Sequence, residues 1–375
     1  MKKIISFSII FCCLLGGNAY GKTLNSIYLY DVNYNEIQND LDYKEIQKVI
    51  KESDIDNFNF EKEVSNVVRG ENIDYSKWLD NIKEIFLYKF KLKKDVMIKV
   101  LILIIMSAIF TNFTSVMGNA YVAQTGYLVV YMILTKVIIS FFGTMYDIGQ
   151  NAIVLVKRFV EVLLPTYTVA SFLGTGFNTA TAFSQITLII IVVIEQVFIK
   201  IVLPLISIYL IIVIVNNINE TNGLSRLSDF IKMIIKWANR GTLGIVTGIV
   251  TIQKLIAPSS DIAATKLVGG GLRYVPYLGN SIDTAKDTVI SAGCLIKNAM
   301  GGVSIVAIIL ICLAPIISLV SYIVIYELIT VVSEPIADKR IINVVKGISE
   351  TGKLLLQSLF TTASLLIITI ALLAS

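Results

Sequence analysis

The sequence has no histidine, only four cysteines and few charged residues, which make up 16% of its 375 positions. Without histidine it lacks the commonest general base and the commonest metal ligand. Cys12 and Cys13 lie in the first apolar segment, while Cys294 and Cys312 lie far from any paired CxxC spacing, which argues against a disulfide framework or a zinc site. No nucleophile, base and orienting group can be assembled from this inventory. We therefore predict a protein that is not an enzyme, with no catalytic residue, cofactor or metal.

The balance of apolar and charged residues differs from that of a soluble domain, in which roughly 25% of residues are charged. Hydrophobic residues make up 55% of this chain, more than one water-soluble core can bury. Of the 27 acidic residues, 15 lie between Asp31 and Asp95, so a short polar region precedes a large apolar one. The net charge is only +5 and no basic run is interleaved with aromatics, which argues against nucleic acid as a partner. The sequence predicts an integral membrane protein in a lipid bilayer.

The amino terminus has the order of a secretory signal peptide. Two lysines, an apolar stretch and a run of small residues follow one another, and we predict that residues 1–21 are the signal, cleaved after Gly21 or after Ala19. The alternative is an uncleaved anchor. Residues 22–95 should then form a polar extracytoplasmic region of a few short amphipathic helices, with only a small core.

Residues 96–375 contain several runs long enough to span a bilayer. A spanning helix needs about 20 mostly apolar residues, because every backbone N–H and C=O must find its partner inside the hydrocarbon. We therefore predict an all-α fold, a multi-pass integral membrane helix bundle. The candidate spans are 100–118, 126–142, 152–173, 186–215, 241–257, 303–328 and 354–373.

The run at 186–215 is longer than one span needs, and it contains Glu195, Lys200 and Pro204 near its middle. It is either one tilted helix or two shorter ones. Basic residues concentrate on cytoplasmic loops, and a split run places the two long basic loops that follow it on the cytoplasmic side. The charge rule therefore favours the split, and the chain should have seven or eight spans.

Two amphipathic segments, 224–240 and 261–300, are expected between the spans. In the first, apolar and basic residues fall mostly on different faces, as in a helix that lies on the bilayer surface or against a partner helix. In the second, Asp283, Asp287 and Ser291 recur at the four-residue spacing that aligns side chains on one helix face. We predict that this face is a partner or conduit surface; the alternative is the ordinary polar face of an interfacial helix.

A polar stripe crosses the third candidate span, because Asp147, Lys157, Arg158 and Glu161 recur at helical spacing. Such a helix lies in the membrane interface or turns its stripe toward a protein interior. We predict a second partner or conduit surface here.

Other charges fall within or at the edge of apolar spans, where an unpaired charge costs at least a few kcal/mol. Glu195 and Lys200 are five residues apart, about 140° around an α-helix, which makes them a poor pair within one helix. Lys136 can instead pair with Glu195 between helices, and the lysines can alternatively snorkel to the headgroups. The residues concerned are Lys136, Glu195, Lys200, Lys254 and Glu327.

Two stretches carry a family resemblance. Val275 to Gly301 reads VPYLGNSIDTAKDTVISAGCLIKNAMG, and Ile309 to Asp338 reads ILICLAPIISLVSYIVIYELITVVSEPIAD. Both resemble the stage III sporulation protein AE family of endospore-forming bacteria, and the order of signal peptide, polar region and spans is similar. The resemblance implies a multi-pass protein of the mother-cell membrane that surrounds the forespore.

The resemblance also implies partners. The family acts with the other products of its operon, including a secretion-type ATPase and ring-forming proteins, and with stage II sporulation protein Q from the forespore side. Together they are thought to form a channel or secretion-like complex needed for late forespore gene expression and forespore integrity. Two other function classes remain: a secondary transporter of a small solute, for which we see no internal repeat, and a scaffold that works through residues 22–95.

Overall fold

The structure, a computed structural model, describes residues 43–53, 58–70, 94–116, 120–175, 177–218, 223–269 and 279–374. Every regular element in these ranges is a helix, which confirms the all-α prediction. The predicted signal peptide, residues 1–21, lies outside the described residues. The elements are α3 (Lys44–Lys51), α4 (Phe60–Val68), α6 (Lys94–Val116), α7 (Ala120–Thr175), α8 (Phe177–Val193), the π-helix η1 (Ile194–Val202), α9 (Leu203–Asn216), α10 (Ser225–Gly269), α11 (Gly279–Ser333) and α12 (Lys339–Ala374).

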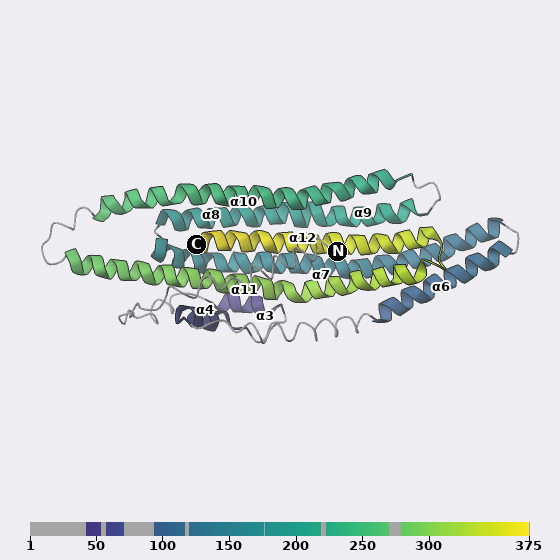
Figure 1. The fold of residues 1–375 in the computed structure, drawn as a ribbon, viewed down its shortest axis with the longest axis horizontal. Helices are drawn as coiled ribbons and strands as arrows, with labels where there is room; N and C mark the ends of the chain where they lie inside the picture. Colours follow the sequence, from purple (N-terminus) through teal and green to yellow (C-terminus); the bar gives the residue numbers. More distant parts are fainter. Residues whose placement is uncertain are drawn as a thin grey trace.

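The long helices lie side by side along one axis (Figure 1). The chain runs in one direction along α7 and returns along α8, η1 and α9. It then runs in the first direction along α10, returns along α11, and runs in the first direction again along α12, so α7, α10 and α12 are parallel. Among the described residues, four helices are long and apolar enough to cross a membrane: Thr125–Phe172, Ala180–Asn216, Ile290–Ser333 and Lys339–Ala371. These helices support the prediction of a membrane protein.

The predicted boundaries between spans are wrong in several places. The spans at 126–142 and 152–173 belong to one helix, α7, because the polar stretch between them stays helical and places its polar side chains on the surface. Of the two alternatives for the run at 186–215, the structure has the single continuous rod and not the two shorter spans that the charge rule favours. The amphipathic segment at 224–240 joins the span at 241–257 in α10, so it packs along the bundle beside α9 and α12 and not across it.

The helices are longer than a bilayer is thick. At 1.5 Å per residue, α7 is about 84 Å long, whereas the hydrocarbon core of a bilayer is about 30 Å thick. The candidate spans alone contain 33 to 48 residues each, or about 50 to 72 Å of helix. A single bilayer can therefore surround only part of each helix.

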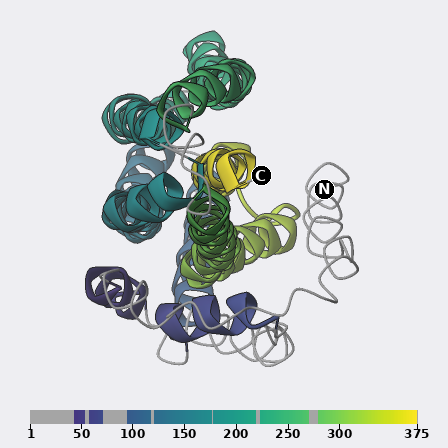
Figure 2. The ribbon, with the colours of Figure 1, turned by 90° about the vertical axis from the view of Figure 1, so that its left-hand side faces the viewer.

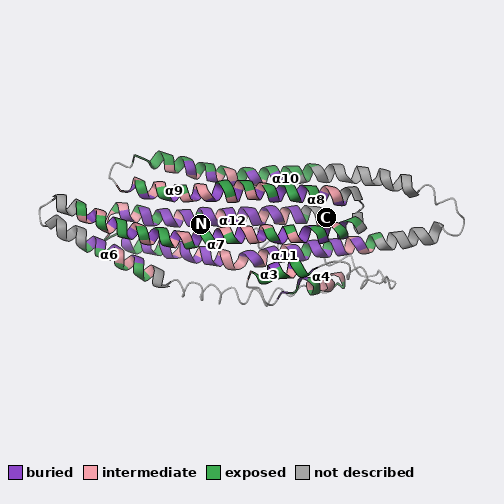
Figure 3. Cartoon of the chain, turned by 180° about the vertical axis from the view of Figure 1, so that it is seen from behind, coloured by how far each residue is buried: buried purple, intermediate pink, exposed green. Residues whose placement is uncertain are grey.

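The core of the bundle is built around α12, which packs against α7, α9, α10 and α11. In Figure 3 buried residues dominate α12, whereas α10 shows a long exposed face. Two glycines of α12 allow neighbours to come close: a β-carbon at Gly347 would meet Val213, and one at Gly352 would meet Met145 and Ile323. Close helix approach at small residues is a common way for membrane helices to pack.

The short helices α3 and α4 cover one side of the bundle, opposite α10 (Figure 2). They are two amphipathic helices of the kind expected in residues 22–95. In α3 the apolar side chains face inward onto α7, and α4 packs on α11. Phe60 is fully buried, and its ring lies edge-on to Phe159 of α7 at 6.3 Å. The Gln47 side chain joins the two short helices, since it donates to the Phe58 carbonyl (2.8 Å) and accepts from the Phe60 N–H (2.9 Å).

A short turn joins α11 to α12 at one end of the bundle. The Asp338 carboxylate caps α12: it accepts hydrogen bonds from the backbone N–H of Arg340 (2.8 Å) and from its guanidinium (3.0 and 3.1 Å). Partial burial opposes ionisation of Asp338, but the hydrogen bonds and charge of Arg340 outweigh it and hold the pKa of that carboxyl below its usual value. The same guanidinium lies 3.7 Å from the ring centroid of Tyr127, which ties the turn to α7.

Candidate polar contact sites in the helix bundle

A cluster of four charges joins α7 to η1. The Lys157 ammonium lies 3.4 Å from a Glu161 oxygen and 3.3 Å from a Glu195 oxygen. The other Glu195 oxygen lies 4.0 Å from the Lys200 ammonium. Acidic and basic groups thus alternate through Glu161, Lys157, Glu195 and Lys200, which we call the charge cluster. Lys157 and Glu161 belong to the polar stripe of the third predicted span, and Glu195 and Lys200 are two of the predicted intramembrane charges.

The π-helix explains a pairing that we expected to be poor. Glu195 and Lys200 lie within η1, where hydrogen bonds run between residues five apart and not four. Residues five apart therefore come closer to one face than the 140° of an α-helix allows. Pro204 follows directly, and because it has no N–H it cannot bond to the carbonyl four residues before it. The sequence of this run, with Pro204 in it, allows one tilted helix or two shorter ones, but it does not predict a π-helix.

The expected pair between Lys136 and Glu195 does not form. Within the described residues Glu195 pairs with Lys157 and Lys200, and Lys136 lies on the exposed face of α7. Lys136 and Lys157 are 21 residues apart, about 32 Å along the helix. The side chain of Lys254, another expected intramembrane charge, lies outside the described residues.

The neighbouring residue Arg158 turns away from the cluster to α3. Its guanidinium donates to both oxygens of Glu52, at 2.7 and 3.2 Å. These side chains are 46% and 38% exposed, so we expect the pair to contribute less than about 1 kcal/mol. Asp147, the fourth residue of the predicted stripe, is exposed and has no ion-pair partner among the described residues.

The second predicted surface is only partly described. Asp283, Asp287 and Ser291 all lie in helix α11, so their four-residue spacing does place them on one face. The side chains of the two aspartates lie outside the described residues, and Ser291 is exposed. Whether this face meets a partner stays a prediction.

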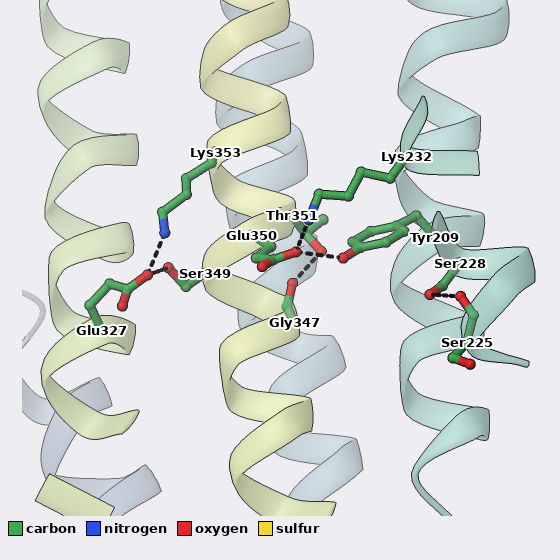
Figure 4. A network of polar contacts seen from close by, with 10 residues as sticks. All are labelled: Tyr209, Ser225, Ser228, Lys232, Glu327, Gly347, Ser349, Glu350, Thr351 and Lys353. Atoms are coloured by element: carbon green, nitrogen blue, oxygen red, sulfur yellow. Dashed lines mark hydrogen bonds and ion pairs between the residues drawn. The ribbon is translucent and has the colours of Figure 1, made fainter. Parts of the chain in front are cut away.

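A second set of polar contacts surrounds α12 (Figure 4). The Glu350 carboxylate pairs with Lys232 of α10 and accepts a hydrogen bond from the Tyr209 hydroxyl of α9 at 2.9 Å. On the other side of α12, Glu327 of α11 pairs with Lys353 and accepts from the Ser349 hydroxyl at 2.8 Å. We call these six residues the α12 network: Tyr209, Lys232, Glu327, Ser349, Glu350 and Lys353.

Sequence reasoning singled out only Glu327 from the α12 network. Glu350 and Lys353 stood in what was expected to be a basic loop, and Lys232 on the polar face of an amphipathic segment. Lys232 and Glu350 are 118 residues apart, and no local spacing connects them. The only sequence feature that pointed to this network was Glu350, a single acidic residue beside an apolar run.

The charge cluster and the α12 network are suited to holding helices together. Both sets of contacts balance their charges, which lowers the cost of placing ionised groups between apolar helices. Within the described residues there is no group of three or more Cys, Asp or Glu side chains that could hold a metal ion. These contacts tie α7 to η1 and α12 to α9, α10 and α11.

Comparisons with known proteins agree with the resemblance noted in the sequence. The family described as Stage III sporulation protein AE matches residues 58–375. The chain is 26% identical over 260 residues to a protein of Bacillus subtilis (strain 168) named Stage III sporulation protein AE. That alignment covers 68% of this chain and 65% of the relative, which is less than two thirds of the relative's length. No solved structure matches the chain.

Proposed function

Because the chain belongs to the stage III sporulation protein AE family, we propose that it is a membrane component of a channel or secretion-like complex that links the mother cell and the forespore. In this role it is required for late forespore gene expression and forespore integrity. The family match over residues 58–375 is the observation that carries the proposal. The helices that are long enough to span a membrane are consistent with it.

The proposal gives the chain an assembly role without catalysis. Its ion pairs hold helices together. In the first predicted surface Lys157 and Arg158 already pair within the chain, which leaves the exposed Asp147 and Glu161 to meet other subunits. We propose that the two predicted surfaces contact partners or line a conduit. They consist of Asp147, Lys157, Arg158 and Glu161 on α7, and of Asp283, Asp287 and Ser291 on α11.

The proposed location is the mother-cell membrane that surrounds the forespore, with residues 22–95 on the extracytoplasmic side. The proposed partners are the secretion-type ATPase and ring-forming subunits of the same operon, and stage II sporulation protein Q from the forespore. The lipid bilayer is the remaining partner, and nucleic acid is not one.

Deletion of the gene in its host tests this function. We expect normal vegetative growth, followed by engulfed forespores that shrink and do not express a late forespore transcription reporter. Normal spores with normal reporter expression would contradict the proposal and favour a secondary transporter of a small solute. The transporter alternative is motivated by the intramembrane charges and by Pro204 in the run at 186–215, where the rod from α8 to α9 is continuous.

Crosslinking tests the partner surfaces separately from the phenotype. A photocrosslinking residue at Asp147 or at Ser291 should trap another member of the complex in sporulating cells. The same residue at Leu355, which is buried in α12, serves as the control. If the exposed positions trap no more partner protein than Leu355 does, the surfaces are wrongly placed.

A further inference from the structure

Exposed apolar side chains extend along much of the bundle, beyond what one bilayer covers. The outer face of α10 exposes Phe230, Met233, Trp237 and Ile245, with Trp237 73% exposed. The outer face of α7 exposes Met132 and other large apolar side chains. Since the hydrocarbon core covers about 30 Å of helices that are more than twice as long, part of this apolar surface requires protein contacts.

Two of the exposed charges on α7 and two on α10 are spaced alike. On α7, Lys136 precedes Asp147 by eleven residues, and on α10, Asp229 precedes Arg240 by eleven residues. Eleven residues are close to three helical turns, so each pair lies on a single face of its helix. All four side chains are exposed, and none has an ion-pair partner among the described residues. Of these four charges, the first on α7 is positive and the second negative, whereas the first on α10 is negative and the second positive. The same helix α10 also carries the exposed Arg226 and the partly buried Lys236.

The two patterns lie at similar heights in the bundle. A β-carbon at Gly149 of α7 would be 3.5 Å from the Leu355 side chain, and Asn239 of α10 donates to Ser358 at 3.3 Å. These contacts fix the height of α7 and α10 relative to α12. Gly149 is thus level with Leu355, and Asn239 is level with Ser358. In this register Asp229 lies about six residues, or about 9 Å, further along the bundle axis than Lys136, and Arg240 lies equally far beyond Asp147.

The surfaces between the charges also differ in size in a complementary way. Between Lys136 and Asp147 the outer face of α7 carries the small residues Ser140, Gly143 and Thr144 beside the exposed Ile139, and a β-carbon at Gly143 would meet no neighbour. Between Asp229 and Arg240 the outer face of α10 carries the exposed Met233 and Trp237. A contact between the two faces would place Met233 and Trp237 of α10 against the small residues of α7.

We propose that two copies of this chain pack side by side, with the α10 face of one copy on the α7 face of the next. Lys136 then meets Asp229, and Asp147 meets Arg240. Both helices run in the same direction, so a copy with a parallel axis and an offset of about 9 Å brings both charge pairs together. Such a contact uses two different faces and can therefore repeat from copy to copy.

Within one chain these two faces are not in contact with each other. Among the described residues α10 packs on α8, α9 and α12, and α7 packs mainly on α6, α8, α11 and α12. A covalent bond between the outer faces of α7 and α10 must therefore join two chains. This inference concerns the chain itself and does not depend on a sporulation role.

Disulfide trapping in membrane vesicles tests the contact. Cys12, Cys13, Cys294 and Cys312 are first replaced by alanine. Asp147→Cys and Arg240→Cys are then placed on separate, differently tagged full-length chains that are expressed together. Oxidation should give a disulfide-linked product that carries both tags. Its yield should be at least tenfold higher than the yield from a control pair in which Asp147→Cys is expressed with Ile252→Cys. Ile252 is exposed on α10 but lies about 18 Å beyond Arg240. Absence of the mixed product, or equal yield with Ile252→Cys, would overturn the proposal.

Charge reversal tests the same contact without cysteine. The pair Lys136→Glu and Asp147→Lys should lower the assembled fraction of the detergent-purified protein at least tenfold, measured by particle mass. Adding Asp229→Lys and Arg240→Glu should restore it. An unchanged mass in the first variant, or no recovery in the second, would contradict the proposal. The thermal unfolding midpoint of each variant reports whether the fold is retained.

Discussion

Lys157 of α7 and Glu195 of η1, 38 residues apart in sequence, lie 3.3 Å from each other and join two long helices by charge. The Lys157 side chain is only 18% exposed, so its charge needs this partner and Glu161. The π-helix turns Glu195 toward Lys157 and brings Lys200 near the same carboxylate. The cluster shows how a locally widened helix can gather charges that an α-helix would spread.

The first prediction concerns this cluster. Lys157→Met should destabilise the bundle by about 1 to 3 kcal/mol, because Glu195 and Glu161 lose the cation between them. Lys157→Met combined with Glu195→Met should recover much of that loss, since the half-buried carboxylate is then gone. Thermal unfolding in detergent measures both variants, and Asn151→Ala, an exposed change on the same helix, serves as the control. A double variant less stable than either single variant would show that the charges contribute independently.

The second prediction separates packing from charge in the docking of α3 and α4. Phe60→Ala should lower the local stability of these helices by about 3 to 5 kcal/mol, because a fully buried ring is lost. Arg158→Ala should cost less than about 1 kcal/mol, because its pair with Glu52 is exposed. Hydrogen exchange of the α3 and α4 amides measures both. Equal effects would contradict the view that packing of the ring dominates, and a larger effect of Arg158→Ala would mean that the ion pair holds the helices in place.

A third prediction uses the close packing at Gly352. Gly352→Ala should destabilise the bundle by about 1 to 3 kcal/mol, since its β-carbon would collide with Met145 and Ile323. Gly244→Ala on α10 is the matched control, because a β-carbon there would meet no neighbour. This control should be neutral or stabilising by up to about 1 kcal/mol, as alanine favours helix. Unfolding midpoints compare the two, and similar values would contradict the packing.

A fourth prediction concerns acid pH and the turn before α12. The pKa of Asp338 is lowered in the folded chain, so its ionised form stabilises the fold above its usual pKa of about 4. That contribution to stability is lost as the pH falls through the lowered pKa that Asp338 has in the folded chain. The stability difference between wild type and Asp338→Asn should therefore be largest near neutral pH and shrink below about pH 4. A difference that stays constant from pH 7 to pH 3 would rule out this role of the carboxylate.

Local spacing predicted which polar residues lie in one stripe of a single α-helix, but not which of them pair. Lys157 and Glu161 are four residues apart, share a face and lie 3.4 Å from each other. The apolar content predicted the membrane class, and two stretches of sequence led to the family. The pairing of Glu195 could not be found in this way, because it depends on the type of helix that contains it and on a second helix.

The sequence by itself determined that the chain is helical, apolar and a member of its family, because composition and short-range periodicity carry that information. Only the tertiary structure decided where helices end and which charges meet. The polar stretch around Gly149 resembles a loop in hydropathy, yet it stays helical where Gly149 packs on Leu355. Lys232 and Glu350 pair across 118 residues because α10 and α12 lie side by side. Such contacts form only when distant segments are brought together, and no local pattern encodes them.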